Sequence, residues 1–169
     1  MAKTPSHAQI RAARSMTGVS QKVLAAKAKV TQSELQLLES PHRKEPDRHK
    51  LERVADALEA LGVLFVASTT QAGEGVRFSK SSDARRETDF FRHGRALLDL
   101  SIDEMASLSG VGRTTIGRIE RDKLINPPEP AIEKIKAVFF ERGMVILEEE
   151  ADIGGGVRFQ EAPFVRKPG

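Results

Sequence analysis

Apolar residues in the first half of the chain recur at helical spacing, interrupted by short polar segments. The clearest segment has apolar positions at i, i+3, i+4 and i+7, which fall on one stripe of a helix and are Leu51, Val54, Ala55 and Leu58. The pattern and its flanking turn residues predict helices over residues 7–17, 20–27, 31–39 and 47–61. Short apolar runs around a Gly-containing loop then predict two strands, at residues 63–66 and 76–78.

The same pattern occurs again 81 residues further along, without a gap. Identical residues meet at this offset, among them Arg14 and Arg95, Ser20 and Ser101, Ala25 and Ala106, Val30 and Val111, Glu39 and Glu120, and the Gly-Val-Arg-Phe runs at 75–78 and 156–159. Chance agreement at one unbroken offset is improbable, so the chain contains one unit twice. The polar segment 79–83 predicts a linker, which divides the chain into domains 1–80 and 81–169. The second domain ends in a short basic tail, 163–169, that we expect to fray.

Composition narrows the classes of function. The chain has no cysteine, no apolar run as long as a membrane span, and no catalytic constellation or phosphate-binding glycine loop. We therefore expect no enzyme, no cofactor or metal ion, no membrane association, and a cytoplasmic location. Positive charge is uneven, because residues 1–80 hold 13 Lys and Arg against 8 Asp and Glu, while residues 81–169 hold 14 against 16. The excess of positive charge in the first half is compatible with nucleic acid as a partner.

Residues 20–39 and 101–120 each predict two short helices joined by a turn. A small residue is needed where two such helices cross closely, and Ala25 and Ala106 fill that position. Apolar residues in both segments then hold the second helix against the first. The outer face of the second helix is left free, and the major groove of DNA is wide enough to admit one α-helix.

These segments resemble the Cro and phage-repressor type of helix-turn-helix, the xenobiotic-response-element family. The run Gly-Val-Gly-Arg-Thr-Thr-Ile-Gly-Arg-Ile-Glu at 110–120 carries the likeness best, and the likeness extends over about residues 9–62 and 90–143. It implies a mainly α fold of two tandem lambda-repressor-like helix-turn-helix bundles, each followed by a short β-hairpin. It also implies sequence-specific binding to double-stranded DNA, although the same bundle serves elsewhere as a protein-docking module.

The resemblance also assigns candidate contact residues. In the second copy the candidate readers are Gly112, Arg113, Thr114 and Arg118, and Gly117 is expected to let the backbone approach DNA closely. Arginine can make a bidentate contact to guanine, and glutamine can read adenine. In the first copy the candidates are Gln21 at a phosphate, Thr31, Gln32, Ser33 and Gln36 on the reading helix, and Arg43 and Lys44 in the following loop.

Several of these residues have simpler interpretations. Arg113 and Arg118 are alternatively solvated surface charges, and Thr31 is better explained as a helix cap than as a base reader. Leu37 stands where the second copy has Arg118, so the first copy either reads other bases or contacts a protein. Glu39 and Glu120 are expected to pair with Arg14 and Arg95 inside each unit, as structural ion pairs of the family do.

Two hypotheses of function follow. The first is a transcription regulator, a repressor, that binds DNA in association with the nucleoid. The second is an antitoxin or antiactivator in which one copy binds a protein partner instead of DNA.

In either case a two-stranded hairpin is only marginally stable alone. The hairpins should therefore pair with each other, giving a pseudo-dimer within the chain, or with a partner chain, giving a homodimer.

Overall fold

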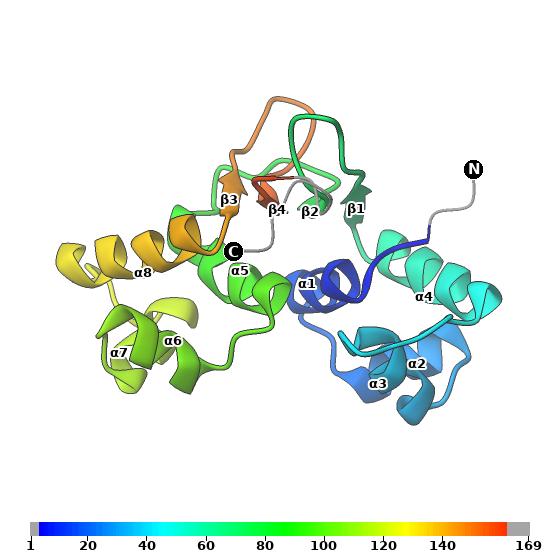
Figure 1. The fold of residues 1–169 in the computed structure, drawn as a ribbon. Helices are drawn as coiled ribbons and strands as arrows, with labels where there is room; N and C mark the ends of the chain where they lie inside the picture. Colours follow the sequence, from blue (N-terminus) through cyan, green and yellow to red (C-terminus); the bar gives the residue numbers. More distant parts are fainter. Residues whose placement is uncertain (1–3, 162–169) are drawn as a thin grey trace.

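The first half of the chain forms four helices and a hairpin, as its hydrophobic pattern predicts. The computed structural model describes residues 4–161, and its first elements are α1 (His7–Thr17), α2 (Gln21–Ala28), α3 (Gln32–Glu39), α4 (Arg48–Ala60), β1 (Val63–Val66) and β2 (Gly75–Phe78) (Figure 1). Each boundary lies within one residue of its prediction. Gly18 ends α1 in the left-handed conformation at φ +70°, which glycine adopts without steric cost. The predicted basic tail, 163–169, lies outside the described residues.

The second half repeats this order with one difference. Its elements are η1 (Glu87–Phe90), α5 (Phe91–Leu98), α6 (Ile102–Ser109), α7 (Arg113–Glu120), α8 (Glu129–Glu141), β3 (Met144–Leu147) and β4 (Gly156–Phe159). The first turn before α5 is a 3₁₀ turn rather than α-helix. In α1 that turn is held by a capping box between Ser6 and Gln9, and the equivalent residues are Glu87 and Phe90, which cannot form one.

The two hairpins join into one antiparallel sheet of strand order β1-β2-β4-β3. The register of the central strands is symmetric, because equivalent residues of the two halves exchange places across it. Val76 lies opposite its equivalent Val157, while Gly75 and Arg77 lie opposite Arg158 and Gly156. Both valines are fully buried. Pairing within the chain, one of the two alternatives expected for the hairpins, is thus what this structure contains.

Reciprocal hydrogen bonds reinforce this junction. Arg77 Nε donates to the carbonyl of Gly154 at 2.7 Å, and Arg158 Nε donates to the carbonyl of Gly73, the equivalent residue, at 3.0 Å. Residue i of one copy therefore contacts residue j of the other, and j contacts i. This reciprocity is the mark of an isologous, two-fold interface, here formed by two non-identical halves of one chain.

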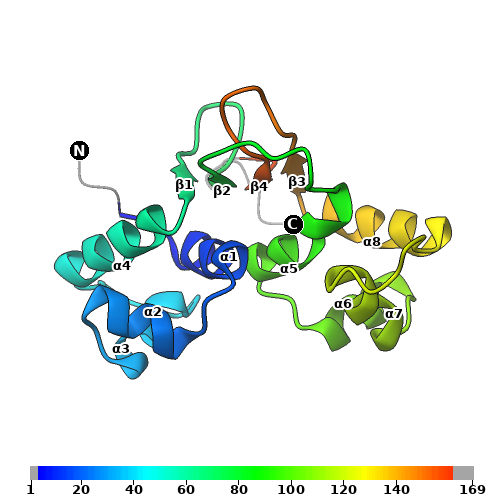
Figure 2. The same cartoon turned by 180° about the vertical axis from the view of Figure 1, so that it is seen from behind.

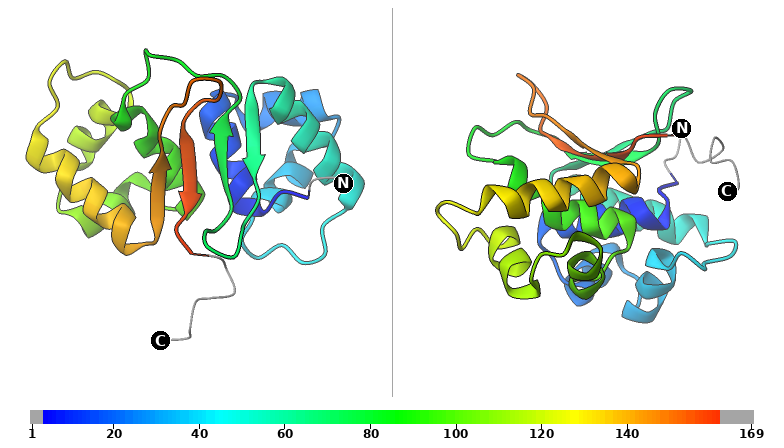
Figure 3. Two further views of the ribbon diagram at one scale, coloured as in Figure 1. Left: turned by 90° about the horizontal axis from the view of Figure 1, so that it is seen from above. Right: turned by 60° about the vertical axis from the view of Figure 1, so that its left-hand side comes forward.

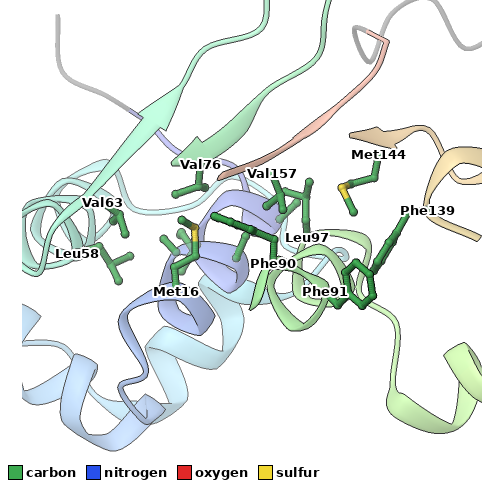
Figure 4. Packing of buried hydrophobic residues seen from close by; sticks show 14 of the residues in the cluster. Met16, Leu58, Val63, Val76, Phe90, Phe91, Leu97, Phe139, Met144 and Val157 are labelled. Atoms are coloured by element: carbon green, nitrogen blue, oxygen red, sulfur yellow. The ribbon is translucent and has the colours of Figure 1, made fainter. Parts of the chain in front are cut away.

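Helices α1 and α5 pack beside each other beneath the sheet (Figures 1 and 3). One apolar core runs through both halves, and Figure 4 shows Met16 of the first and Phe90 of the second beneath Val76 and Val157. Buried Gln9 fastens α1 to the hairpin, because its amide nitrogen donates to the carbonyls of Val66 at 3.0 Å and Gly75 at 2.9 Å.

The overall architecture is therefore a mixed, α-rich fold with a small antiparallel sheet. The pair α2 and α3 and the pair α6 and α7 both lie on the side away from the sheet, one pair in each half (Figures 1 and 2). No helix in the described part of the chain has the length and apolar character needed to cross a membrane.

Candidate nucleic-acid interface

An arginine–glutamate pair anchors the candidate reading helix in each half, as the sequence predicts. Arg14 Nε lies 2.6 Å from Glu39 Oε1, and Arg95 Nε lies 2.7 Å from Glu120 Oε1. Each arginine makes a second bond through Nη2, so both pairs are bidentate. The glutamate side chains are only 6% and 5% exposed. Because an unpaired buried charge is costly, these pairs fix the C-terminal ends of α3 and α7 against α1 and α5.

Two predicted contact residues of the first half continue this network outward. Gln21 Nε2 donates to Glu39 Oε2 at 2.8 Å, and Gln36 Nε2 donates to Gln21 Oε1 at 3.4 Å. Gln21 is half-buried and Gln36 is exposed. The network therefore orients the amide of Gln36 on the outer face of α3, starting from a buried ion pair.

The remaining first-half candidates lie at the exposed start of α3. Thr31, Gln32 and Ser33 are all exposed. Thr31 caps the helix, because its hydroxyl accepts from the amide of Glu34 at 3.1 Å, so its interpretation as a cap is confirmed. The carboxylate of Glu34 lies 3.4 Å from Lys50 Nζ, which offsets a negative charge that would otherwise repel phosphate.

Second-half candidates occupy the equivalent face of α7. Arg113, Thr114 and Arg118 are exposed. The guanidinium of Arg113 pairs with Asp103 at 3.2 Å, and both side chains are 68% exposed. An ion pair this exposed contributes little, so Arg113 is free to exchange partners. Gly112 is the N-cap and offers no side-chain acceptor, which leaves the first backbone N–H groups of α7 without a side-chain cap.

The expected close approach of DNA to Gly117 is wrong. Gly117 is buried, and a Cβ atom there would lie 3.5 Å from Ile102 Cδ1 and 3.0 Å from Arg121 Nη2. Ile102 stands where the first half has Gln21, and it covers the helix with a side chain instead of forming a hydrogen bond. Gly117 thus makes room for neighbouring side chains rather than for a ligand.

Arg121 is a candidate that sequence reasoning missed. Its Nε donates to the carbonyl of Gly117 at 3.0 Å, which lays the exposed guanidinium along α7. Arg113, Gly117 and Arg121 are four residues apart, so the two arginines share one side of the helix with a glycine between them. That spacing is the signal that could have identified it.

The two loop candidates have different surroundings. Lys44 is exposed. Arg43 is half-buried and donates to the carbonyls of Leu38 at 3.0 Å and Pro5 at 2.9 Å, and burial lowers the pKa of its guanidinium. Arg43 therefore braces the loop after α3 against the chain before α1. Contact with a phosphate stays a prediction for both residues.

The candidate residues form two clusters, one around α3 and one around α7, on the same side of the molecule (Figures 1 and 2). The α3 cluster is rich in amides and hydroxyls, and the α7 cluster is rich in guanidinium groups. Comparison of the chain with family models, curated proteins and solved structures found no match.

Proposed function

We propose that this protein is a sequence-specific duplex-DNA-binding regulator of the repressor type, acting in the cytoplasm at the nucleoid. In this proposal α2–α3 and α6–α7 are helix-turn-helix units of two tandem lambda-repressor-like bundles. The observation that carries it is the pseudo-two-fold arrangement, which places α3 and α7 on one side of the chain (Figure 1), each with exposed polar residues. A two-fold-related pair of reading helices suits two major-groove segments about one helical turn, or ~34 Å, apart.

The two reading faces differ, so the proposal specifies unlike half-sites. Arg113 and Arg118 on α7 suit guanine, because a guanidinium can donate to its O6 and N7 atoms. Gln32 and Gln36 on α3 suit adenine, because an amide can bond its N6 and N7 atoms. A monomer of this protein would therefore bind a two-part, non-palindromic site.

Selection of bound sequences from random duplex DNA tests the proposal. We expect two unlike half-sites at fixed spacing, and binding that falls steeply with salt. Paired substitution of Arg113 and Arg118 by alanine should erase the guanine-containing half-site alone. Arg142→Ala, which removes one exposed charge near the sheet, is the control for each of the single substitutions Arg113→Ala and Arg118→Ala. Absence of any enriched sequence, together with binding indifferent to salt, would refute the proposal.

A second candidate function rests on exposed Leu37. Its side chain is 66% exposed on the outer face of α3, which is unusual for a base-reading position and suits docking to a protein, as in an antitoxin or antiactivator. The variant Leu37→Arg introduces the residue that the second half carries at the equivalent place. If α3 reads DNA, this variant should bind duplex more tightly and gain a guanine preference. If α3 docks a protein, duplex binding should be unchanged and partner capture lost.

A further inference from the structure

A cavity of about 280 Å³ lies between α1 and α5 and is lined by four arginines. Arg11 and Arg14 come from α1, and their equivalents at the 81-residue offset, Arg92 and Arg95, come from α5. The cavity therefore straddles the pseudo-two-fold axis. Arg11 and Arg14 lie on the side of α1 turned away from Gln9, which faces the sheet. The cavity therefore lies on the side of α1 and α5 away from the sheet, the side on which Figure 1 places α3 and α7.

Three of the four guanidinium groups have partners within the protein. Arg14 and Arg95 are each neutralised by a buried glutamate, as described above. Arg11 donates to the carbonyl of Ala96 at 3.0 Å and lies 3.5 Å from Asp99 Oδ1. Arg11 Nη1 also contacts His7 Nδ1 and the carbonyl of Glu39, and its Nη2 donates to the carbonyl of Leu97 at 3.4 Å. Because a guanidinium has five N–H donors, these contacts fix Arg11 in place and leave one Nη2–H group without a partner among the described residues.

Arg92 breaks the symmetry. Its equivalent, Arg11, crosses to the opposite helix, but Arg92 is exposed and has no hydrogen bond or ion pair within residues 4–161. Burial, and then the positive charge of Arg92, lower the pKa of His93, whose Nδ1 lies 2.8 Å from Ser15 Oγ. Ser15 also lines the cavity. Arg92 is thus the lining arginine whose guanidinium has no partner among the described residues.

We propose that this cavity binds a phosphate-sized oxyanion, held by Arg92 together with the remaining Nη2–H group of Arg11. Ser15 is a further donor in the tautomer in which His93 Nδ1–H donates to its hydroxyl oxygen. Guanidinium groups match phosphate oxygens in a bidentate geometry, and the arginine-lined cavity has room for a group of that size. The phosphate comes either from the backbone of bound DNA, at the centre of the site, or from a free phosphorylated molecule. Only the first source rests on the proposed function.

Titration of inorganic phosphate into the full chain, against chloride at equal ionic strength, tests the site directly. Heat of binding and the unfolding midpoint are measured for the wild type, for Arg92→Gln, and for Arg142→Gln as a matched loss of one exposed arginine charge. We expect phosphate to raise the midpoint of the wild type and of Arg142→Gln. Arg92→Gln should bind phosphate at least tenfold more weakly.

Duplex binding in phosphate-free buffer separates the two sources. If DNA supplies the phosphate, Arg92→Gln weakens duplex binding for all sequences alike and reduces the salt slope by about 1. If a free molecule supplies it, duplex affinity is unchanged while phosphate binding is lost. The proposal is overturned if Arg92→Gln matches Arg142→Gln in both assays. A wild type that binds no duplex would refute the proposed function, and the phosphate titration would then decide the cavity alone.

Discussion

Acid should destabilise this protein through His93, which is half-buried at the junction of its two halves. The imidazole lies edge-on to Phe78 and Phe90, with ring centroids 6.1 and 6.2 Å away, and its Nδ1 meets Ser15 Oγ at 2.8 Å. Burial, and then the positive charges of Arg92 and Arg85, lower the pKa of His93 from 6.5 to about 3. No carboxylate offsets this, so the folded protein holds the ring neutral.

The size of the effect follows from linkage. Below pH 6.5 the unfolded chain binds a proton at His93, while the folded chain does not until about pH 3. The contribution of His93 to the free energy of unfolding is therefore fully present above pH 6.5, the pKa in the unfolded chain, and is lost as the pH falls toward about 3. At about pH 5 the pH is roughly 1.5 units below the pKa of His93 in the unfolded chain. Protonation then stabilises the unfolded state, and the free energy of unfolding falls by about 2 kcal/mol.

Urea unfolding at about pH 7.5 and pH 5 measures this loss, with His93→Ala as the comparison. Alanine is the residue at the equivalent position of the first half, Ala12, so the helix tolerates it. The variant is less stable at neutral pH, but its loss between the two pH values should be smaller than that of the wild type by about 2 kcal/mol. Burial also lowers the pKa of His7, and that contribution is common to both proteins. Equal losses in the two proteins would refute the reasoning.

Three further substitutions test the junction and the ion pairs by urea unfolding. Gly75→Ala should destabilise by about 1–3 kcal/mol, because the new methyl group would overlap strand β4, and an unchanged midpoint would contradict the close approach. Gln9→Leu should cost about 1–3 kcal/mol, since it removes the donor to the buried carbonyl of Gly75, and a neutral outcome would show that water replaces the amide. Glu120→Gln should cost about 1.5–3 kcal/mol by weakening the charged hydrogen bonds to Arg95, and stability equal to the wild type would assign that pair no structural role.

The local elements of this fold could be predicted from the sequence because local chemistry specifies them. Gly18, Ser20 and Thr31 end or begin helices through their own backbone preference or hydroxyl group, and each does so where predicted. The ion pair of Arg14 and Glu39 was likewise predictable, since repetition at an 81-residue offset marks both residues together. The identity of the hairpin partner was not, because strand pairing depends on contacts between distant segments.

Side-chain roles at the candidate interface were harder to predict because they depend on neighbours in space. A glycine such as Gly117 would allow DNA to approach the backbone closely, but the side chain of Ile102 from the preceding helix covers it. Arg43 has the charge of a phosphate contact, but two backbone carbonyls bind it. The arginine cavity could not be inferred either, because Arg11 and Arg92 come together only when the two halves meet.

Joining both halves in one chain changes what substitution at the two-fold axis can do. In a homodimer every residue at the axis occurs twice, so a change acts on both sides at once. Here the equivalent positions hold Ala12 in the first half and His93 in the second, and Arg11 has hydrogen-bond partners where Arg92 has none among the described residues. Because the halves cannot dissociate, the unfolding midpoint of the junction should be independent of protein concentration, whereas that of a homodimer rises with it. A concentration-dependent midpoint would mean that a second chain completes the fold. The joining of both halves in one chain would then no longer explain why the two reading faces differ.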